Sequence, residues 1–370
     1  MSVSKPIGHR LSPVTTSASS RVLSQLSMCP DPLHRGVPIR FRERFFPLGT
    51  VVQVESNDEA VIKASRRSFG LYGATPSTPE SEFLIQICVD PNRHDEGPPR
   101  VPCYRSLKHI FHIACSESNF AVADLASGCA VGFVTPEMLE DTSFFRYRFL
   151  ECLFHVWVVH RSHTPVHGSG ITLDRRGVLI CGPAGAGKST LAYACAKSGM
   201  QILTDDVAHV RIDPASKQLL VWGNPWCLRL LPDAVQLFPE LSDEKVTLRG
   251  NHDGYLEVDT LSRFQGSPMA SCQPVGLVFL ERTEGAVTRL SPMRREIALD
   301  RVRRDIVLDE DVVMERHYSV LEQLVRTGTY TLTYSGGLST AVQAIRSVLQ
   351  NSFEGNNFRV ESNHGMTGPV

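Results

Sequence analysis

The chain has 370 residues, which is enough for two domains that each bury a hydrophobic core. Its 38 lysines and arginines nearly balance its 39 aspartates and glutamates, and the formal net charge at pH 7 is −1. This balance offers no broad attraction for nucleic acid or for an anionic membrane surface. No apolar stretch approaches the roughly 20 residues that a membrane-spanning helix requires. We therefore expect no nucleic-acid partner and no membrane partner.

The ten cysteines are scattered along the chain without a Cys-x-x-Cys pair. Most of them lie in apolar runs, where cysteine acts as a small hydrophobic residue. The pattern argues against a zinc site or a disulfide framework and is typical of a reducing compartment. On this basis we expect a cytoplasmic protein.

The N-terminal part divides into a tail and a domain. Residues 1–36 are rich in serine and proline and are expected to form a disordered tail. Residues 37–160 contain short strand signals separated by turns, which predict an N-terminal α+β domain without a motif that would define its role. These strand signals stand at residues 50–54, 83–88 and 120–123. A helix from about Phe144 to Val159 is expected to lead into the next domain.

A glycine-rich loop follows and carries the most specific motif of the chain. Gly182 to Ser189 reads Gly-Pro-Ala-Gly-Ala-Gly-Lys-Ser and matches the spacing G-x-x-x-x-G-K-[ST] without a mismatch. An apolar run at residues 177–181 precedes it as a predicted strand, and a predicted helix at residues 189–198 follows and ends at Gly199. Strand, loop and helix in this order predict a phosphate-binding loop for a nucleoside triphosphate.

The residues of this loop predict how the phosphates are held. Backbone N–H groups close on phosphate oxygens, Lys188 reaches the outer phosphates, and Ser189 supplies a hydroxyl to Mg2+. The residues expected to contact the nucleotide are Gly182, Pro183, Ala184, Gly185, Ala186, Gly187, Lys188, Ser189 and Thr190.

Charged residues stand on both sides of the loop. After it, a predicted strand at residues 201–204 ends in the pair Asp205 and Asp206. Carboxylates at a strand end beside a phosphate loop can hold magnesium and take a proton from an attacking hydroxyl. Before the loop lies His167, placed to contact a transferring phosphoryl group or to orient one of the aspartates.

This set of residues resembles the catalytic domain of the HPr kinase/phosphorylase family. That family carries a histidine before the loop, the loop itself and an Asp-Asp pair after it, and the spacings here agree over about residues 167–210. The resemblance implies an α/β P-loop kinase domain of the HPr kinase and PEP carboxykinase-like type, with a mixed sheet flanked by helices. It places this domain at residues 161–350, and a second disordered tail is expected at residues 351–370. It also implies that the ligands are ATP and Mg2+.

The resemblance further implies a role for each charged residue. Lys188 takes the place of the phosphate-binding lysine, and Ser189 that of the magnesium-binding hydroxyl. Asp206 takes the place of the carboxylate that accepts the proton of a serine hydroxyl, and Asp205 lies beside it near the metal. His167 takes the place of the active-site histidine. The implied catalytic residues are therefore Asp206, His167 and Lys188, and the implied metal ligands are Ser189 and Asp205.

The chain also departs from the family pattern. The family has an Arg-Gly-Leu-Gly block that supplies a glutamate to magnesium, whereas residues 222–230 here read Trp-Gly-Asn-Pro-Trp-Cys-Leu-Arg-Leu. This stretch is similar to divergent HPr-kinase-like proteins, and it counts against HPr itself as the acceptor and against the reverse phosphorylase reaction. Arg229 is the local candidate for a guanidinium that clamps phosphate. The alternative is an ordinary surface arginine after a strand.

The acceptor of the phosphate stays open. The resemblance implies an ATP-dependent serine kinase-like phosphotransferase, and the serine of a protein or peptide is the first choice of acceptor. Free L-serine or another small hydroxyl compound is the alternative, as is a regulatory module that binds ATP without transferring phosphate. Members of the family form hexamers, so a homo-oligomer is a further open alternative.

The C-terminal part offers one rival interpretation. Residues 278–281 form an apolar run that ends in Glu281, and residues 335–339 resemble the signature peptide of transporter ATPases. Their order excludes that class, because the signature precedes the acidic strand in transporters. We expect Glu281 to pair locally at a strand end, and a second metal ligand is the alternative for it. Other predicted elements are strands at residues 207–212, 219–222, 275–280 and 330–334, helices at residues 294–304 and 340–349, and a polar loop at residues 242–253.

Overall fold

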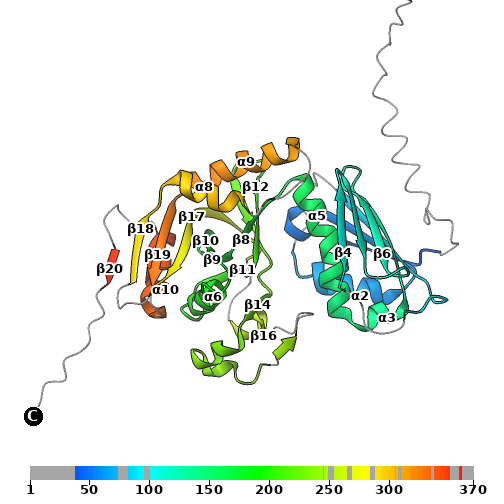
Figure 1. Ribbon diagram of the computed structural model, residues 1–370, viewed down its shortest axis with the longest axis horizontal. Coiled ribbons are helices and arrows are strands. Elements are labelled where there is room, and N and C mark those ends of the chain that lie inside the picture. The colour runs from blue at the N-terminus through cyan, green and yellow to red at the C-terminus, as the bar shows by residue number, and fades with distance from the viewer. Residues whose placement is uncertain are drawn as a thin grey trace, which may run out of the picture.

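The computed structural model describes residues 38–73, 82–95, 101–244, 246–248, 254–264, 269–283, 288–304, 306, 311–334, 337–350 and 358–360. Within these residues the chain forms two bodies, each built around a mixed β-sheet with helices (Figure 1). The tail expected at residues 1–36 lies outside the described residues. No helix in the described part of the chain is long and apolar enough to cross a membrane.

A seven-stranded sheet forms the N-terminal body. Its strand order is β1-β2-β3-β7-β6-β5-β4, in which β2 is parallel to β3 and β3 to β7, whereas the other neighbours are antiparallel. The strands are β1 (Phe41–Phe45), β2 (Val51–Ser56), β3 (Glu82–Val89), β4 (Cys103–Leu107), β5 (Ile110–Ala114), β6 (Phe120–Asp124) and β7 (Cys129–Val134). Residues such as Phe111 and Ile113 alternate inward along their strands and fill the core.

Helices pack against one face of this sheet. The helical elements are α2 (Glu59–Phe69), α3 (Pro136–Glu140), α4 (Thr142–Phe144), η2 (Phe145–Leu150) and α5 (Glu151–Arg161). The Asp58 side chain begins α2 by accepting the N–H of Ala60. Segment η2 is π-helical and runs directly into α5. On α5, Trp157 stacks on Phe83 of the sheet with ring centroids 4.7 Å apart, so α5 is held firmly on the N-terminal core.

A ten-stranded sheet forms the C-terminal body. Along the main path the strand order is β11-β9-β10-β17-β13-β12-β8. Strand β19 also pairs with β17, β18 pairs with β19, and β20 pairs with β18. The strands are β8 (Thr164–His167), β9 (Ser169–Leu173), β10 (Arg176–Cys181), β11 (Gln201–Thr204), β12 (Val207–Ile212), β13 (Leu219–Trp222), β17 (Ser271–Arg282), β18 (Thr288–Pro292), β19 (Thr329–Tyr334) and β20 (Phe358–Val360). A separate small sheet has the order β14-β16-β15 and consists of β14 (Cys227–Leu230), β15 (Val246–Leu248) and β16 (Gly254–Asp259).

Strand direction decides which loops meet. Strand β9 is antiparallel to both β10 and β11, so β10 and β11 point the same way. Strand β17 is parallel to β10, and β19 is parallel to β17. The carboxyl ends of these four strands therefore lie at one edge of the sheet, where ligands bind in open α/β sheets.

Helices cover both faces of the C-terminal sheet (Figure 1). One face carries α6 (Lys188–Lys197) and α10 (Leu338–Leu349), and the other carries α8 (Arg295–Arg303) and α9 (Asp311–Arg326). Along β10, Val178 and Ile180 pack toward α6 and α10, whereas Leu179 and Cys181 pack toward α8 and α9. Because both faces are buried, β10 has the continuous apolar sequence of a covered strand.

Several elements differ from those expected from the sequence. Strands β8 and β9 lie between the α5 helix and β10, and neither is predicted by the sequence pattern. Strand β15 forms within the polar stretch 242–253, where a loop is expected, and β20 pairs with β18 within the segment 351–370, where a tail is expected. The other residues of that segment lie outside the described part of the chain.

Buried imidazoles join the two bodies. His155 on α5 stacks on His209 on β12 with ring centroids 5.0 Å apart, and His163 meets His209 edge-on at 6.3 Å. The Nε2 of His163 hydrogen-bonds the main-chain oxygen of Leu48 at 3.1 Å. Burial lowers the pKa of His163 and of His209 well below the usual range, and the Arg211 guanidinium lowers that of His163 further. These histidines are therefore neutral when the two bodies are packed together.

We expect acid to destabilise this interface. In the unfolded chain a histidine titrates near pH 6.5, whereas His163 and His209 must stay neutral in the folded state to a lower pH. The unfolded state then binds more protons, so the free energy of unfolding should fall as the pH drops below about 6.5, by up to about 1.4 kcal/mol per pH unit for each such histidine. Urea unfolding between pH 7.5 and 5 measures this slope. His209→Phe should reduce the slope, and an unchanged slope in this variant would contradict the assignment.

Candidate functional site

A loop from Gly182 to Gly187 joins the end of β10 to the start of α6. Three of its glycines have positive φ angles, 152° at Gly182, 77° at Gly185 and 92° at Gly187, which residues with a Cβ rarely adopt. Because a glycine precedes the helix, no side chain caps the first turn of α6. The N–H groups of that turn and the positive end of the helix dipole are therefore directed toward the loop, as a polyanion requires.

The Lys188 side chain turns back over this loop from the first position of α6. Its Nζ donates to the main-chain oxygen of Gly182 at 2.9 Å and to that of Pro183 at 3.1 Å. These bonds hold the ammonium above the exposed tip of the loop, which includes Ala184 and Gly185. An anion seated on the loop would lie within reach of this charge, and a charge-assisted hydrogen bond of this kind is about twice as strong as a neutral one.

Tyr334 at the end of β19 supports the loop from below. Its hydroxyl donates to the main-chain oxygen of Ala186 at 2.9 Å. A Cβ added to Gly187 would lie only 2.3 Å from the same hydroxyl and 3.7 Å from the ring carbon Cζ. The contact with Tyr334 therefore leaves no room for a side chain at residue 187.

Asp205 stands at the end of β11 and contacts Ser189 of the loop. Its Oδ2 accepts the backbone N–H of Arg229 at 2.8 Å, and the Ser189 side chain lies close enough to the carboxyl group to lower its pKa. The Ser169 hydroxyl of β9 donates to the main-chain oxygen of Asp205 at 2.7 Å. Burial raises the pKa of Asp205, and the nearby charge of Asp206 raises it further, while the Ser189 side chain and the N–H of Arg229 oppose this shift. The two residues expected at the metal are thus brought together.

Asp206 and His167 form a second pair at the same edge. The register of β8 and β12 sets Val207 opposite His167, and the N–H of Gly168 donates to the main-chain oxygen of Asp206 at 2.9 Å. This arrangement leaves the His167 Nδ1 3.4 Å from Asp206 Oδ1. The side chains are 41% and 57% exposed, so both can meet a ligand. His167 ends β8, and the whole of β9 separates it in the chain from β10, the strand that enters the loop.

Arg229 is held inside the site and is not an ordinary surface arginine. Its guanidinium carbon lies 5.0 Å from the ring centre of Tyr147 and 5.5 Å from that of Tyr255. The Nε of Arg229 is buried without a hydrogen-bond partner among the described residues. A buried donor of this kind costs stability unless a ligand satisfies it.

A large cleft lies between the two bodies, and the aspartate pair is part of its lining. Its volume is about 1650 Å3, and its lining includes Asp205, Asp206, Arg229 and Tyr255 from the C-terminal body. The opposite wall comes from α2, η2 and α5 of the N-terminal body. Sequence reasoning missed this wall because these segments carry no motif and lie far from the loop in the chain.

Tyr147 of η2 ties the two walls together. Its hydroxyl donates to Glu257 Oε1 on β16 at 2.8 Å. The same carboxylate oxygen accepts the Cys227 thiol at 3.2 Å. Burial and the hydrogen bond to Glu257 raise the pKa of Tyr147, so the phenol stays protonated and remains a donor. The N-terminal body is therefore part of the site.

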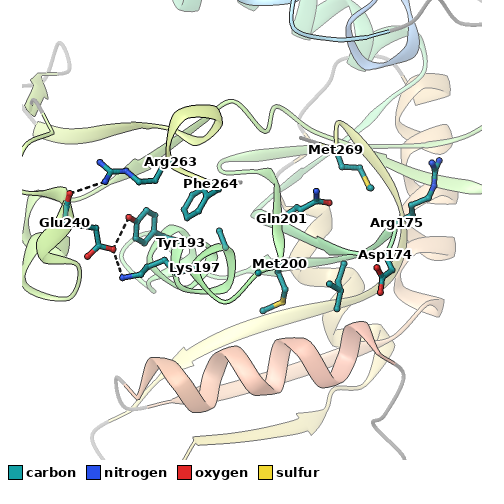
Figure 2. Close-up of a pocket in the computed structure, with 13 residues that line it drawn as sticks. Asp174, Arg175, Tyr193, Lys197, Met200, Gln201, Glu240, Arg263, Phe264 and Met269 are labelled. Carbon is teal, nitrogen blue, oxygen red and sulfur yellow. Dashed lines mark hydrogen bonds and ion pairs between the residues drawn. The ribbon is translucent and has the colours of Figure 1, made fainter. Parts of the chain in front are cut away.

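A second cavity lies at the other end of α6 and is remote from the loop (Figure 2). Its volume is about 740 Å3, and its wall includes Lys197, whose Nζ lies 2.5 Å from Glu240 Oε1, and Tyr193, whose hydroxyl donates to the same oxygen at 3.2 Å. Because Lys197 is the last residue of α6 and Lys188 the first, this cavity and the glycine loop lie at opposite ends of the helix.

The remaining charged candidate has a local partner. Glu281 at the end of β17 forms an ion pair with Arg301 of α8, at 3.1 Å between Oε1 and Nη2, as expected from the sequence. Within the described ranges no group of three or more histidine, cysteine, aspartate or glutamate side chains forms a metal cage. The Ser189 and Asp205 pair is suited to magnesium, which commonly takes few protein ligands and keeps waters.

Comparison with protein-family profiles finds no match, and no curated protein matches the chain either. Among solved structures, the chain is similar to the HPr(Ser) kinase/phosphatase from Coxiella burnetii. The two share 15% sequence identity over 51% of this chain and 95% of that chain, with a TM-score of 0.28. This likeness is distant.

The contact between Gly187 and Tyr334 can be tested by a double-mutant cycle. Gly187→Ala should destabilise the protein because of both the positive φ and the collision with the Tyr334 hydroxyl, by about 1–3 kcal/mol. Gly185→Ala, which has a positive φ but no atom within 4 Å of the new Cβ, should show the backbone cost alone. Tyr334→Phe removes the colliding atom, so Gly187→Ala should cost less in that background. Chemical denaturation measures all four variants, and additive effects would contradict the close packing.

Proposed function

We propose that this protein is a phosphotransferase that binds Mg-ATP on the loop Gly182–Thr190 and transfers the γ-phosphate to a serine hydroxyl of a protein or peptide. The observation that carries the proposal is the convergence of the loop, Lys188, Ser189 and the two aspartates at one edge of the sheet. A phosphate cradle alone would serve a binding protein. A solvent-accessible carboxylate beside it supplies the proton acceptor that transfer to a hydroxyl needs.

The residues present fit both ligands. The positive-φ glycines and the uncapped start of α6 suit the phosphates, with the Lys188 ammonium above them. The Ser189 hydroxyl and the Asp205 carboxylate, which lie close to each other, would hold Mg2+. Bound there, the ion would neutralise charge on the phosphate oxygens. Its charge would also favour the ionised form of Asp205, whose pKa burial otherwise raises.

Asp206 is the proposed general base. The acceptor Oγ attacks the γ-phosphorus in line, so that an Oγ–P bond forms as the bond from that phosphorus to the ADP oxygen breaks, and ADP leaves with the bonding electron pair. The serine proton passes to the Asp206 carboxylate. His167, 3.4 Å away, orients this carboxylate and stabilises its charge before the transfer. Lys188 offsets the charge that spreads over the transferred group.

Arg229 is proposed to stabilise a ligand anion in the cleft. Its planar guanidinium lies over two tyrosine rings, and its buried Nε donor has no partner among the residues that the structure describes. The backbone N–H of Arg229 donates to Asp205, so the position of Arg229 depends on that of the proposed metal ligand Asp205. A phosphate oxygen or an anionic group of the acceptor would satisfy this donor.

Asp206→Asn should abolish transfer and leave nucleotide binding nearly intact, because the carboxylate acts in the chemical step. The loss of a general base predicts a fall in kcat of about 10²- to 10⁴-fold. Single-turnover transfer from labelled ATP, together with binding of a fluorescent ATP analogue, separates the two effects. Asp233→Asn, an exposed carboxylate of the same body, is the matched control. Full activity of Asp206→Asn would show that Asp206 is not the base.

Lys188→Ala should weaken both binding and turnover. The lost charge-assisted hydrogen bonds are worth about 1.5–3 kcal/mol, so the Kd for Mg-ATP should rise about 10- to 100-fold. Lys197→Ala at the other end of α6 controls for loss of a lysine from the same helix and should leave the Kd unchanged. Equal effects of the two substitutions, measured by calorimetric titration, would argue against nucleotide binding on this loop.

Mass spectrometry can identify the acceptor class. Wild-type protein and Asp206→Asn are each incubated with Mg-ATP and either serine-containing peptides or free L-serine. Phosphopeptide made only by the wild type would support the proposed function. Phosphoserine made only from free L-serine would favour a small-molecule kinase, and ATP binding without either product would favour a regulatory module.

A further inference from the structure

Two arginines lie against the ring of Tyr147, and only one of them has a carboxylate partner. The guanidinium carbon of Arg146 is 4.9 Å from the ring centre, and that of Arg229 is 5.0 Å from it. Arg146 is paired with Glu151, at 3.3 Å between Nη2 and Oε1. The guanidinium of Arg229 forms no ion pair with a carboxylate of the residues that the structure describes, and its Nε is buried without a hydrogen-bond partner there. The charge of Arg229 is therefore available to a ligand.

A carboxylate lies directly across the small sheet from Arg229. Strands β14 and β16 are antiparallel, and their register sets Arg229 opposite Glu257. Side chains that face each other in this way have Cβ atoms about 4.5–5.5 Å apart, and opposite charges at such positions attract each other. The sheet therefore favours an ion pair between Arg229 and Glu257, yet these two described residues do not form one.

Other donors hold the Glu257 carboxylate. Its Oε1 accepts the Tyr147 hydroxyl at 2.8 Å and the Cys227 thiol at 3.2 Å. Cys227 lies two residues before Arg229 on β14, so the two side chains leave the same face of the small sheet. Tyr147 instead comes from η2 of the N-terminal body. A hydrogen bond to an ionised carboxylate is short and strong, so the Tyr147 hydroxyl fixes Glu257 in an orientation without an ion pair to Arg229.

The other carboxylates near Arg229 are related to it differently. Burial raises the pKa of Asp205 and of Glu151, and the Arg229 charge opposes the shift in both without forming an ion pair. Asp205 accepts the backbone N–H of Arg229, and Glu151 is paired with Arg146. Glu257 alone of these three carboxylates stands opposite Arg229 in the sheet register. It is therefore the carboxylate that competes with a ligand for the guanidinium.

We propose that the Tyr147 hydroxyl holds Glu257 in this orientation and so keeps the Arg229 guanidinium available to an oxyanion in the cleft. The inference rests on the anion-binding role proposed above for Arg229 and adds a positioning residue from the other body. Without the hydroxyl, the carboxylate turns to the guanidinium opposite it and neutralises the charge. Because Tyr147 and Glu257 belong to different bodies, anion binding by Arg229 depends on the packing of the two bodies against each other.

Inorganic phosphate is the probe for this proposal, and the Nε–H signal of Arg229 in the NMR spectrum of protein with isotope-labelled arginine is the readout. Burial of this group slows its exchange with water and keeps the signal observable, and Arg229→Lys assigns it. We expect phosphate to shift the signal in the wild type. Tyr147→Phe keeps the ring beside the guanidinium and removes only the hydroxyl, so the Kd for phosphate should rise about tenfold.

A second substitution separates positioning from packing. Glu257→Gln combined with Tyr147→Phe removes the charge that would neutralise Arg229, so the Kd for phosphate should return to within about twofold of the wild-type value. A residue that only held the bodies together would show no such rescue. Tyr72→Phe is the matched control, because the Tyr72 hydroxyl also joins the two bodies, donating to the main-chain oxygen of Gly223 at 3.2 Å, but its loss frees no carboxylate. This control should bind phosphate like the wild type.

The outcomes distinguish this inference from the function on which it rests. A loss of phosphate affinity in Tyr147→Phe that Glu257→Gln restores supports the inference. Unchanged affinity in Tyr147→Phe, a loss without rescue, or an equal loss in Tyr72→Phe would overturn it and leave Arg229 as an anion-binding residue. A wild-type signal that does not respond to phosphate would overturn the inference together with the anion-binding role of Arg229. The phosphotransferase function is decided separately, by transfer from labelled ATP and by binding of Mg-ATP.

Discussion

Strand β9 is the constraint on which the site depends. Because it is antiparallel to both β10 and β11, these two strands end at the same edge of the sheet. The glycine loop leaves β10 there, and Asp205 follows β11 there. Ser169 is the first residue of β9, and its hydroxyl holds Asp205 in place by donating to the main-chain oxygen of Asp205. A loop and a carboxylate separated by a whole helix in the chain thereby come close together.

The site keeps its charged groups in different environments. Asp205 is largely enclosed and accepts the backbone N–H of Arg229, which limits its freedom to move. Asp206 is the next residue but is exposed beside His167. In the proposed function these adjacent carboxylates take different tasks, Asp205 at the metal and Asp206 as the proton acceptor. The geometry of a tight bend between β11 and β12 is sufficient to produce this separation.

Much of the C-terminal body could be predicted from the sequence, because its buried strands are continuous apolar runs. The expected strands at residues 207–212 and 219–222 have the bounds of β12 and β13, and the helix after the loop is shifted by one residue. Strand β9, Ser-Gly-Ile-Thr-Leu, escaped prediction because small and polar residues interrupt its pattern. The cleft escaped because its two walls meet only through tertiary contacts, such as Tyr147 with Glu257.

The π-helical segment η2 has a consequence for how the wall of the cleft can change. Its wide turn places Phe145, Phe149 and Leu150 in the core while Tyr147 and Arg148 line the cleft. Deleting one residue here would restore regular winding and turn the following side chains by about 100°. Such a deletion would replace the side chains that line the cleft and leave the glycine loop untouched. The cleft could therefore change its lining through the loss of a single codon while the loop keeps its geometry.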